Sequence, residues 1–519
     1  MDSSATFSAE GQQLVRDLQA AAAVQPITGD KVHVTGIGSG IYKAYEKLRN
    51  AAEYGEQHLL LRAAIERFLR RMALVQSSSD KLGNDLVTEL TQAGYLPDGS
   101  IPVITVEHVD TYIQQYANLA RSLEAMPEVP GTTARRWVLQ VLSSSLEKLL
   151  VPNPRADVFI EFANRHYTAA IDRQDFPGAS DQQFADCLYV AVHRALLKSD
   201  IAVVRYHVVA RGAQGGFSAS TFAALCRTVD EQFQSKLANQ LTRLISRNGA
   251  PMRILREIIV SGSTDPAALL TNHPNLLMVV RSVAEQQYSA AQKRLLNGVA
   301  RALAFIVISK VLIGLAIEVP YDLARSGTVA FLPLAVNLLF PALYMASARW
   351  EIVKPGIQNT EMLANYAERI VYQTNARLYY RVPRHTQSRR QQAIFNLIYG
   401  LLFVLSFGLV IYVLSLLHFT AVHIIIFFVF FSAVSFLRFR LLQAAKELEL
   451  LDTRQSFIAT VADLFYTPFV RLGMWLSDRY KQVNVMTIIL DFAIELPLKT
   501  SLGLLGQWVS FARDKRDEL

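Results

Sequence analysis

The chain has 519 residues, of which 51% are hydrophobic and only 18% are charged, and its mean hydropathy is positive. An ordinary soluble protein of this length is excluded, because so many apolar residues must gather in membrane segments. The formal net charge of +8 divides into +1 over residues 1–295, where 30 Lys and Arg face 29 Asp and Glu, and +7 over residues 296–519. The excess positive charge therefore lies beside the apolar segments, which favours anionic lipid over nucleic acid as the acidic partner.

The first half of the chain reads as a series of amphipathic helices. The stretches "IYKAYEKLRNAAEY" and "HLLLRAAIERFLRRMALV" carry apolar residues at helical spacing and charged residues on the other faces. Further helical stretches are separated by turn sequences rich in Gly, Pro, Ser and Asp, without a fixed repeat. We therefore predict an all-α domain over residues 1–295. Since the start "MDSSATFSAEGQQLVRDL" lacks the pattern of a secretory signal, we expect this domain to stay in the cytosol.

Motifs for catalysis, metal binding or cofactor binding are not recognisable in this half. The two cysteines, Cys187 and Cys226, form no CxxC pair, which excludes a disulfide framework. The SxxK spacing of Ser145 and Lys148 lies within a helical run and lacks the companion motifs of the enzymes that use it. We therefore expect no catalytic residues, no cofactor and no metal, and we favour a protein that is not an enzyme.

Four apolar segments in the second half are long enough, or nearly so, to cross a membrane: about 302–319, 329–347, 394–417 and 420–437. The last two are the most apolar and are joined by only two residues, so we predict a transmembrane hairpin over 394–437. The first two form a less apolar pair within 296–347. The sequence does not decide whether that pair spans fully.

Basic residues gather in the segment 348–393, before the first span and after the fourth. Positive residues mark the cytoplasmic side, so both termini are predicted to be cytoplasmic in a multi-pass plasma (inner) membrane protein. The segment 348–393 also interleaves arginines with tyrosines, a composition suited to anionic headgroups. Its candidate lipid contacts are Arg377, Arg381, Arg384, Arg389 and Arg390.

Residues 438–519 are predicted to form a cytosolic helix and a membrane-interfacial amphipathic tail. In "DLFYTPFVRLGMWLSDRYK" the apolar residues share one face, and Trp475 is suited to the headgroup level. The following apolar run, residues 482–512, contains Asp491 and Glu495 on a narrow polar line and ends near Trp508. It could lie on the bilayer or dip into it.

Lys310 stands in the middle of the first span. Helix rise places it about 12 Å from either end, so its ammonium group should face protein or water rather than lipid. Glu318 lies two turns away on the same helix, which we expect to be too far to pair, and this leaves Asn337, Asp491 and Glu495 as partners. Either a structural ion pair or a functional intramembrane site explains such a residue.

The stretches "AYEKLRNAAEY", "HLLLRAAIERFL" and "DLVTELTQAGYLPDGSIP" are similar to a family of bacterial multi-pass membrane proteins with a long helical N-terminal domain. The resemblance covers mainly the first hundred residues. It implies a helical cytosolic domain and a bacterial inner membrane, and it carries no activity or ligand.

Three functions fit this organisation. The leading hypothesis is a membrane-anchored scaffold, whose cytosolic domain recruits a protein partner. The alternative is a transporter or channel that uses Lys310 and the second span, which Pro333 and Pro341 interrupt. A membrane-embedded enzyme acting on lipids is the third hypothesis. The oligomeric state does not follow from the sequence.

Overall fold

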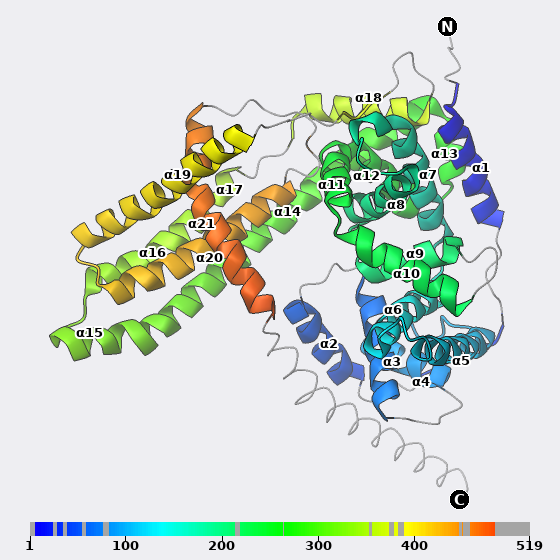
Figure 1. The fold of residues 1–519 in the computed structure, drawn as a ribbon, viewed down its shortest axis with the longest axis horizontal. Coiled ribbons are helices and arrows are strands. Elements are labelled where there is room, and N and C mark those ends of the chain that lie inside the picture. Colours follow the sequence, from blue (N-terminus) through cyan, green and yellow to red (C-terminus); the bar gives the residue numbers. More distant parts are fainter. Residues whose placement is uncertain are drawn as a thin grey trace, which may run out of the picture.

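The computed structural model describes residues 6–23, 29–34, 39–53, 59–75, 82–212, 218–262, 264–351, 355–372, 378–381, 389–445, 449 and 457–482. Within these ranges every regular element is a helix, apart from three isolated β-bridges, which confirms the predicted all-α class. Figure 1 shows two parts: a compact group of helices that contains the N-terminus, and a bundle of long helices that projects from it.

The first part is a helical domain built mainly from the N-terminal half of the chain, and it is named the soluble domain below because most of its helices are not candidate membrane spans. Its helices are α1 (Ala9–Ala23), α2 (Ser39–Glu53), α3 (Leu60–Val75), α4 (Leu82–Ala93), α5 (Val103–Glu124), α6 (Gly131–Leu150), α7 (Pro154–Ala170), α8 (Asp181–Val192), α9 (Ile201–Gly212), α10 (Ala219–Phe233), α11 (Lys236–Asn248), α12 (Ala250–Glu257) and α13 (Pro266–Thr271). Polar caps start several of them: the side chains of Asn153, Ser180 and Ser235 accept hydrogen bonds from backbone N–H groups of α7, α8 and α11.

The domain has three hydrophobic cores. The largest lies between α1, α7, α8, α11, α12 and the first turns of the helix that begins at His273. It includes Phe159, Phe162 and Leu188, each fully buried. A second core joins α3, α4, α5 and α6, and a third joins α5, α6, α9 and α10. The amphipathic pattern of the sequence is thus used in helix-to-helix packing, as predicted.

Helix α14 (His273–Ile313) connects the domain to the projecting bundle (Figure 1). Its first turns bury Leu276, Val280 and Ala284 in the largest core of the soluble domain, and its last turns bury Ile306 and Lys310 among the bundle helices. The expected domain boundary at residue 295 therefore falls inside one continuous helix.

Helix α18 (Ile357–Val371) returns from the bundle to the same core. It buries Leu363, Ala367 and Val371 there, so part of the basic segment 348–393 belongs to the soluble domain. Beyond α18, Tyr380 also contacts this domain. It forms an isolated β-bridge with Ile171 and is buried beside His166 and Tyr167. The domain is therefore assembled from two stretches of chain that membrane helices separate.

Among the residues that the structure describes, the bundle contains four helices that are long and apolar enough to cross a membrane, as predicted, with candidate spans within His273–Ser326, Phe331–Glu351, Asn396–Leu416 and Ala421–Gln443. Its elements are α14, a π-helical turn (Gly314–Glu318), α15 (Val319–Ser326), α16 (Phe331–Ala346), α17 (Ala348–Glu351), α19 (Arg389–Leu416) and α20 (Ala421–Ala445). The first helix runs on to Ser326, seven residues beyond the predicted end of the span.

Helix α21 (Phe457–Gln482) packs across α19 and α20. Phe469 is fully buried, with its ring centroid 4.7 Å from that of Phe407 and 4.8 Å from that of Phe431. Since Phe407 and Phe431 lie at the middle of their candidate spans, this contact is deeper than the headgroup plane in which we expected the helix to lie. The predicted apolar face of α21 is present, and its part around Phe469 packs against the hairpin of α19 and α20.

Candidate functional site: a buried polar cluster in the membrane bundle

Lys310 is paired within the bundle rather than exposed to lipid. Its Nζ donates a hydrogen bond to Oε1 of Glu318 at 3.2 Å, and the side chains of both residues are 1% exposed. On another side Nζ lies 4.5 Å from the centroid of the Phe430 ring, a cation–π distance. Our expectation that Glu318 is too far along the helix to pair with Lys310 is therefore wrong.

A π-helical turn explains this pairing. In a regular α-helix two residues eight positions apart differ by about 80° around the axis, so they do not face each other. The π-turn over Gly314–Glu318 absorbs an additional residue, which brings positions 310 and 318 close to one face. The turn ends two residues before Pro320, whose ring would collide with the carbonyl of a regular preceding turn.

Asn337, on α16, links this ion pair to the start of α20. Its Nδ2 donates to Oε2 of Glu318 at 3.0 Å and approaches the carbonyl oxygen of His423 at 3.4 Å. The sequence identified Asn337 as a partner for the intramembrane charges, and the structure places it in contact with Glu318 rather than with Lys310.

A second pair, His423 with Asp322, was missed in the sequence. His423 Nε2 lies 3.4 Å from Asp322 Oδ1, and the side chains are 0% and 5% exposed. The imidazole Nδ1 lies 3.0 Å from Oγ1 of Thr420, and Oδ2 of Asp322 accepts the backbone N–H of Ala330 at 2.9 Å. The signal in the sequence was that His423 is the one ionisable residue of the fourth span, while Asp322 was assigned to an outer loop.

Two polar atoms of this cluster stay without a hydrogen bond among the described residues: Oδ1 of Asn337 and Nε2 of His423. The cluster thus comprises Lys310, Glu318, Asp322, Asn337 and His423, and is named the polar cluster below. The other predicted intramembrane candidates, Asp491 and Glu495, lie outside the described residues. A group of three or more His, Cys, Asp or Glu residues that could hold a metal is not found in the part of the chain that the structure describes.

The predicted lipid-surface residues are only partly visible. Arg381 and Trp475 are exposed, and Arg479 lies over the Trp475 ring at 5.9 Å. Helix α19 begins at Arg389 and Arg390, whose side chains are not described. Arg377, Arg384 and Trp508 lie outside the described residues.

At the end of the bundle near the soluble domain, Arg438 of α20 contacts α16, the residue that caps it, and α17. Its guanidinium group donates to the carbonyl oxygen of Tyr344 and, at 2.8 Å, to Oγ of Ser347. It also pairs with the carboxylate of Glu351. This arginine, which we counted as a cytoplasmic marker, therefore also fixes α20 against the end of α16.

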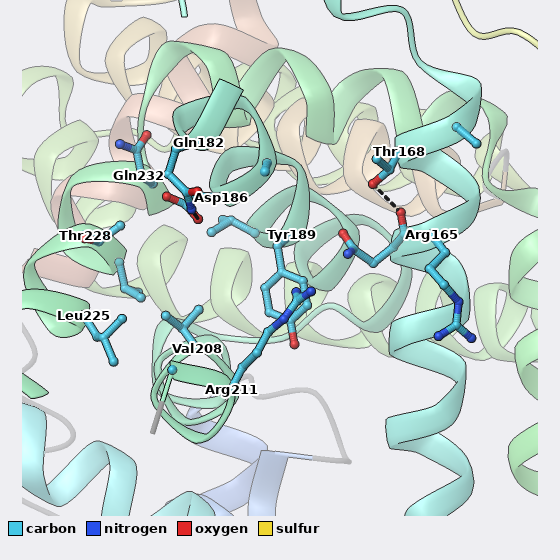
Figure 2. Close-up of a pocket in the computed structure, with 16 residues that line it drawn as sticks. Arg165, Thr168, Gln182, Asp186, Tyr189, Val208, Arg211, Leu225, Thr228 and Gln232 are labelled. Carbon is cyan, nitrogen blue, oxygen red and sulfur yellow. Dashed lines mark hydrogen bonds between the residues drawn. The ribbon is translucent and has the colours of Figure 1, made fainter. Parts of the chain in front are cut away.

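The soluble domain contains a cleft of about 690 Å³ between α7, α8, α9 and α10 (Figure 2). Apolar side chains such as Val208 and Leu225 share its lining with polar ones, among them Arg165, Gln182, Asp186, Tyr189, Arg211, Thr228 and Gln232. The Arg211 guanidinium lies over the Tyr189 ring at 5.2 Å, and burial raises the pKa of Asp186. A volume of this size suits a small molecule or the side chains of a docked segment.

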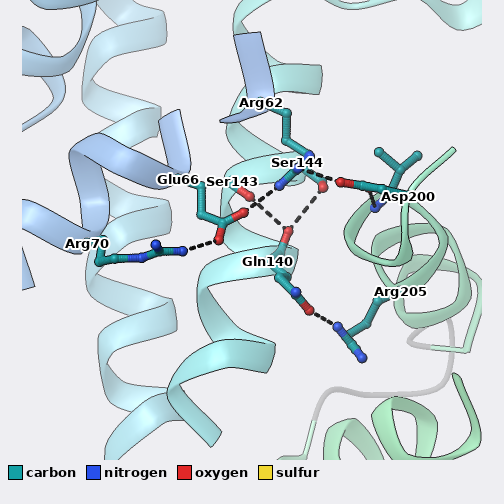
Figure 3. A network of polar contacts seen from close by, with 9 residues as sticks. Arg62, Glu66, Arg70, Gln140, Ser143, Ser144, Asp200 and Arg205 are labelled. Atoms are coloured by element: carbon teal, nitrogen blue, oxygen red, sulfur yellow. Dashed lines mark hydrogen bonds and ion pairs between the residues drawn. The ribbon is translucent and has the colours of Figure 1, made fainter. Parts of the chain in front are cut away.

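A buried polar network holds α3, α6 and α9 together beside this cleft (Figure 3). Arg62 bridges Glu66, at 2.6 Å, and Asp200, at 2.5 Å. Arg205 is fully buried and bonds to Gln140 and Asp230. Because breaking such pairs leaves a charge without its partner, this network makes the packing of the domain specific.

Comparison with known proteins found no matching family model, no similar curated protein and no similar solved structure.

Proposed function

We propose that the protein is a membrane-anchored scaffold, which recruits a protein partner through its helical soluble domain. The observation that carries this proposal is the double attachment between domain and bundle. Both α14 and α18 leave the bundle and become part of one hydrophobic core. A scaffold would use such a mounting to hold a partner at a fixed distance from the bilayer.

Polar contacts between α14 and α18 support a stiff attachment. Arg281 makes two hydrogen bonds of 2.9 Å to the carboxylate of Glu361, which raise the pKa of this arginine. Asn359 donates to the Tyr288 hydroxyl at 2.7 Å, both residues being buried. These contacts lock the two helices in register, so that movement of the bundle is passed to the domain.

The cleft between α7, α8, α9 and α10 is the surface that we assign to the partner. It combines an apolar lining with charged and amide groups at its edge, which is the anatomy of a protein recognition site. Arg211 and Tyr189 supply the residue types that most often dominate binding energy. The proposed partner therefore offers an apolar side chain for the cleft and an acidic group for Arg211.

For the membrane, we propose an inner (plasma) membrane with both termini in the cytoplasm. The arginines at the domain end of the bundle, including Arg301, Arg349 and Arg440, support this orientation. The exposed Arg381 and Trp475 support contact with anionic headgroups. Nucleic acid has no role in this proposal.

The test is site-specific photo-crosslinking in cells that express the full chain. A photoreactive amino acid replaces Gln182 or Thr228 in the cleft, or Glu107, an exposed residue of α5, as the matched control. We expect a discrete cross-linked protein from both cleft positions and none from Glu107, with loss of the product when Arg211 is changed to Glu. Cross-links from none of the cleft positions, or the same products from all three sites, would count against recruitment through the cleft.

Transport remains the second candidate function, because the polar cluster keeps an unbonded amide oxygen on Asn337. A solute path would also have to pass Lys310, which is 3% exposed and engaged by Glu318. That engagement likewise removes Lys310 as a free base for a lipid-modifying enzyme. Both alternatives thus require the ion pair to open, and the scaffold does not.

A further inference from the structure

The charges of the polar cluster do not balance unless the cluster holds a proton. It contains two carboxylates, Glu318 and Asp322, against one ammonium group, that of Lys310, and all three side chains are at least 95% buried. A net charge in the apolar part of a membrane costs several kcal/mol, so a neutral cluster is strongly favoured. His423 is the group that can supply the missing charge.

The contacts of His423 favour the doubly protonated ring. With both nitrogens protonated, Nδ1–H donates to Thr420 Oγ1 at 3.0 Å and Nε2–H faces Asp322 Oδ1 at 3.4 Å. If the neutral ring carries its hydrogen on Nδ1, the Nε2 lone pair faces a carboxylate. If the hydrogen is on Nε2, the neutral ring turns this N–H toward Asp322 but leaves the cluster with one negative charge.

The site lies at the end of the bundle farthest from the soluble domain (Figure 1). Thr420 precedes α20, and Asp322 accepts the N–H of Ala330 in the short connection between α15 and α16. His423 is therefore within about two turns of the aqueous boundary, whereas Lys310 is near the middle of its span. A proton can reach His423 from that side without passing Lys310.

We propose that His423 and Asp322 form a proton-binding site that opens to the side of the membrane opposite the soluble domain. The bound proton rests on His423 Nε2, where it neutralises Asp322, while Lys310 and Glu318 form a separate, self-balanced pair. Asn337 connects the two pairs through Glu318 Oε2 and the His423 carbonyl oxygen. This inference is independent of the scaffold function.

Other groups facing His423 do not replace Asp322 as its partner. From α15, Tyr321 stacks edge-on with a centroid distance of 6.2 Å, and its hydroxyl accepts a hydrogen bond from the exposed Arg325. From α16 comes the uncharged Asn337, and from the hairpin turn comes Phe419 at 6.0 Å. Among the described residues, Asp322 thus supplies the carboxylate nearest to this imidazole.

The test is nitrogen-15 NMR of the full chain in lipid nanodiscs, with histidine labelled. His423→Gln identifies the signals of His423 among the ten histidines, since charged and neutral imidazoles have separate nitrogen shifts. We expect a charged His423 ring at pH 7 in the wild type. We expect a neutral ring at the same pH in Asp322→Asn.

A neutral ring in the wild type, or a charged ring that persists in Asp322→Asn, would overturn the proposal. If Asp322→Asn does not insert, the wild-type spectrum still decides, because the proposal requires the charged form there. Insertion of each variant is checked by size-exclusion chromatography of the nanodiscs.

Discussion

Removal of the Lys310 charge tests the energetic role of the ion pair. The pair has a separation of 3.2 Å and both side chains are 1% exposed, so at an effective dielectric constant of about 20 Coulomb's law gives about 5 kcal/mol of attraction. Lys310→Met keeps most of the length of the side chain but leaves Glu318 charged and buried, with Asn337 as its remaining side-chain partner among the described residues. We expect it to destabilise the bundle by about 3–5 kcal/mol.

The double variant Lys310→Met/Glu318→Gln separates the energy of the lost attraction from the cost of leaving Glu318 charged and buried without Lys310. Since neither residue is then charged, the cost should fall to about 1 kcal/mol or vanish. The assay is reversible unfolding of the purified protein in mixed micelles, with the interaction energy taken from the double-mutant cycle. If the single and double variants lose equal stability, the pair does not act as a unit and the argument from the polar cluster fails.

Three further predictions concern other parts of the fold. Gly473→Ala should destabilise the attachment of α21 by about 1–3 kcal/mol, because a Cβ there would overlap the backbone of α20. The control Gly408→Ala should be nearly neutral, because there is open space around its Cβ. Thermal unfolding measures both variants. Burial raises the pKa of Glu147 to about 7, so the folded state binds a proton more tightly than the unfolded state. Stability should therefore fall by up to about 3 kcal/mol as the pH rises from 5 to 8, and Glu147→Gln should remove this dependence in pH-dependent melting. In urea unfolding, Arg205→Met should lower the free energy of unfolding by about 3–5 kcal/mol, and Arg136→Met should lower it by less than about 1 kcal/mol. Both arginines bond Asp230, but of the two only Arg205 is buried.

The sequence was sufficient to predict the helices and the candidate spans. Apolar runs such as 394–417 report directly on membrane segments, because their length and composition depend on the bilayer rather than on neighbouring helices. In the soluble domain, the helical spacing of residues such as Leu61, Ile65 and Phe68 predicts which face of their helix packs into the core.

The pairing of Lys310 with Glu318 could not be read from spacing, since it depends on a local π-turn that regular helix geometry does not include. The pair of Asp322 with His423 joins residues about a hundred positions apart, and a single sequence holds no signal for such a contact. The segment 348–393 was treated as one basic unit from its composition, whereas its helix α18 packs an apolar face into the soluble domain. The tail helix showed the same ambiguity, because an amphipathic face fits a bilayer surface and a protein groove equally well.

The most direct measurement of the central claim, that the bundle anchors the domain and is sealed around Lys310, is the water accessibility of its interior near that residue. Ile306 is 3% exposed and lies one turn from Lys310 on the same face of α14, so Ile306→Cys leaves the ion pair intact. With Cys187 and Cys226 replaced by alanine, this thiol is challenged in intact membranes with a water-soluble maleimide, and Arg325→Cys serves as the exposed control. The account predicts rapid labelling at position 325, from the side opposite the soluble domain, and none at position 306. Labelling at position 306 in the folded protein would contradict the sealed anchor and would favour a transport path past Lys310.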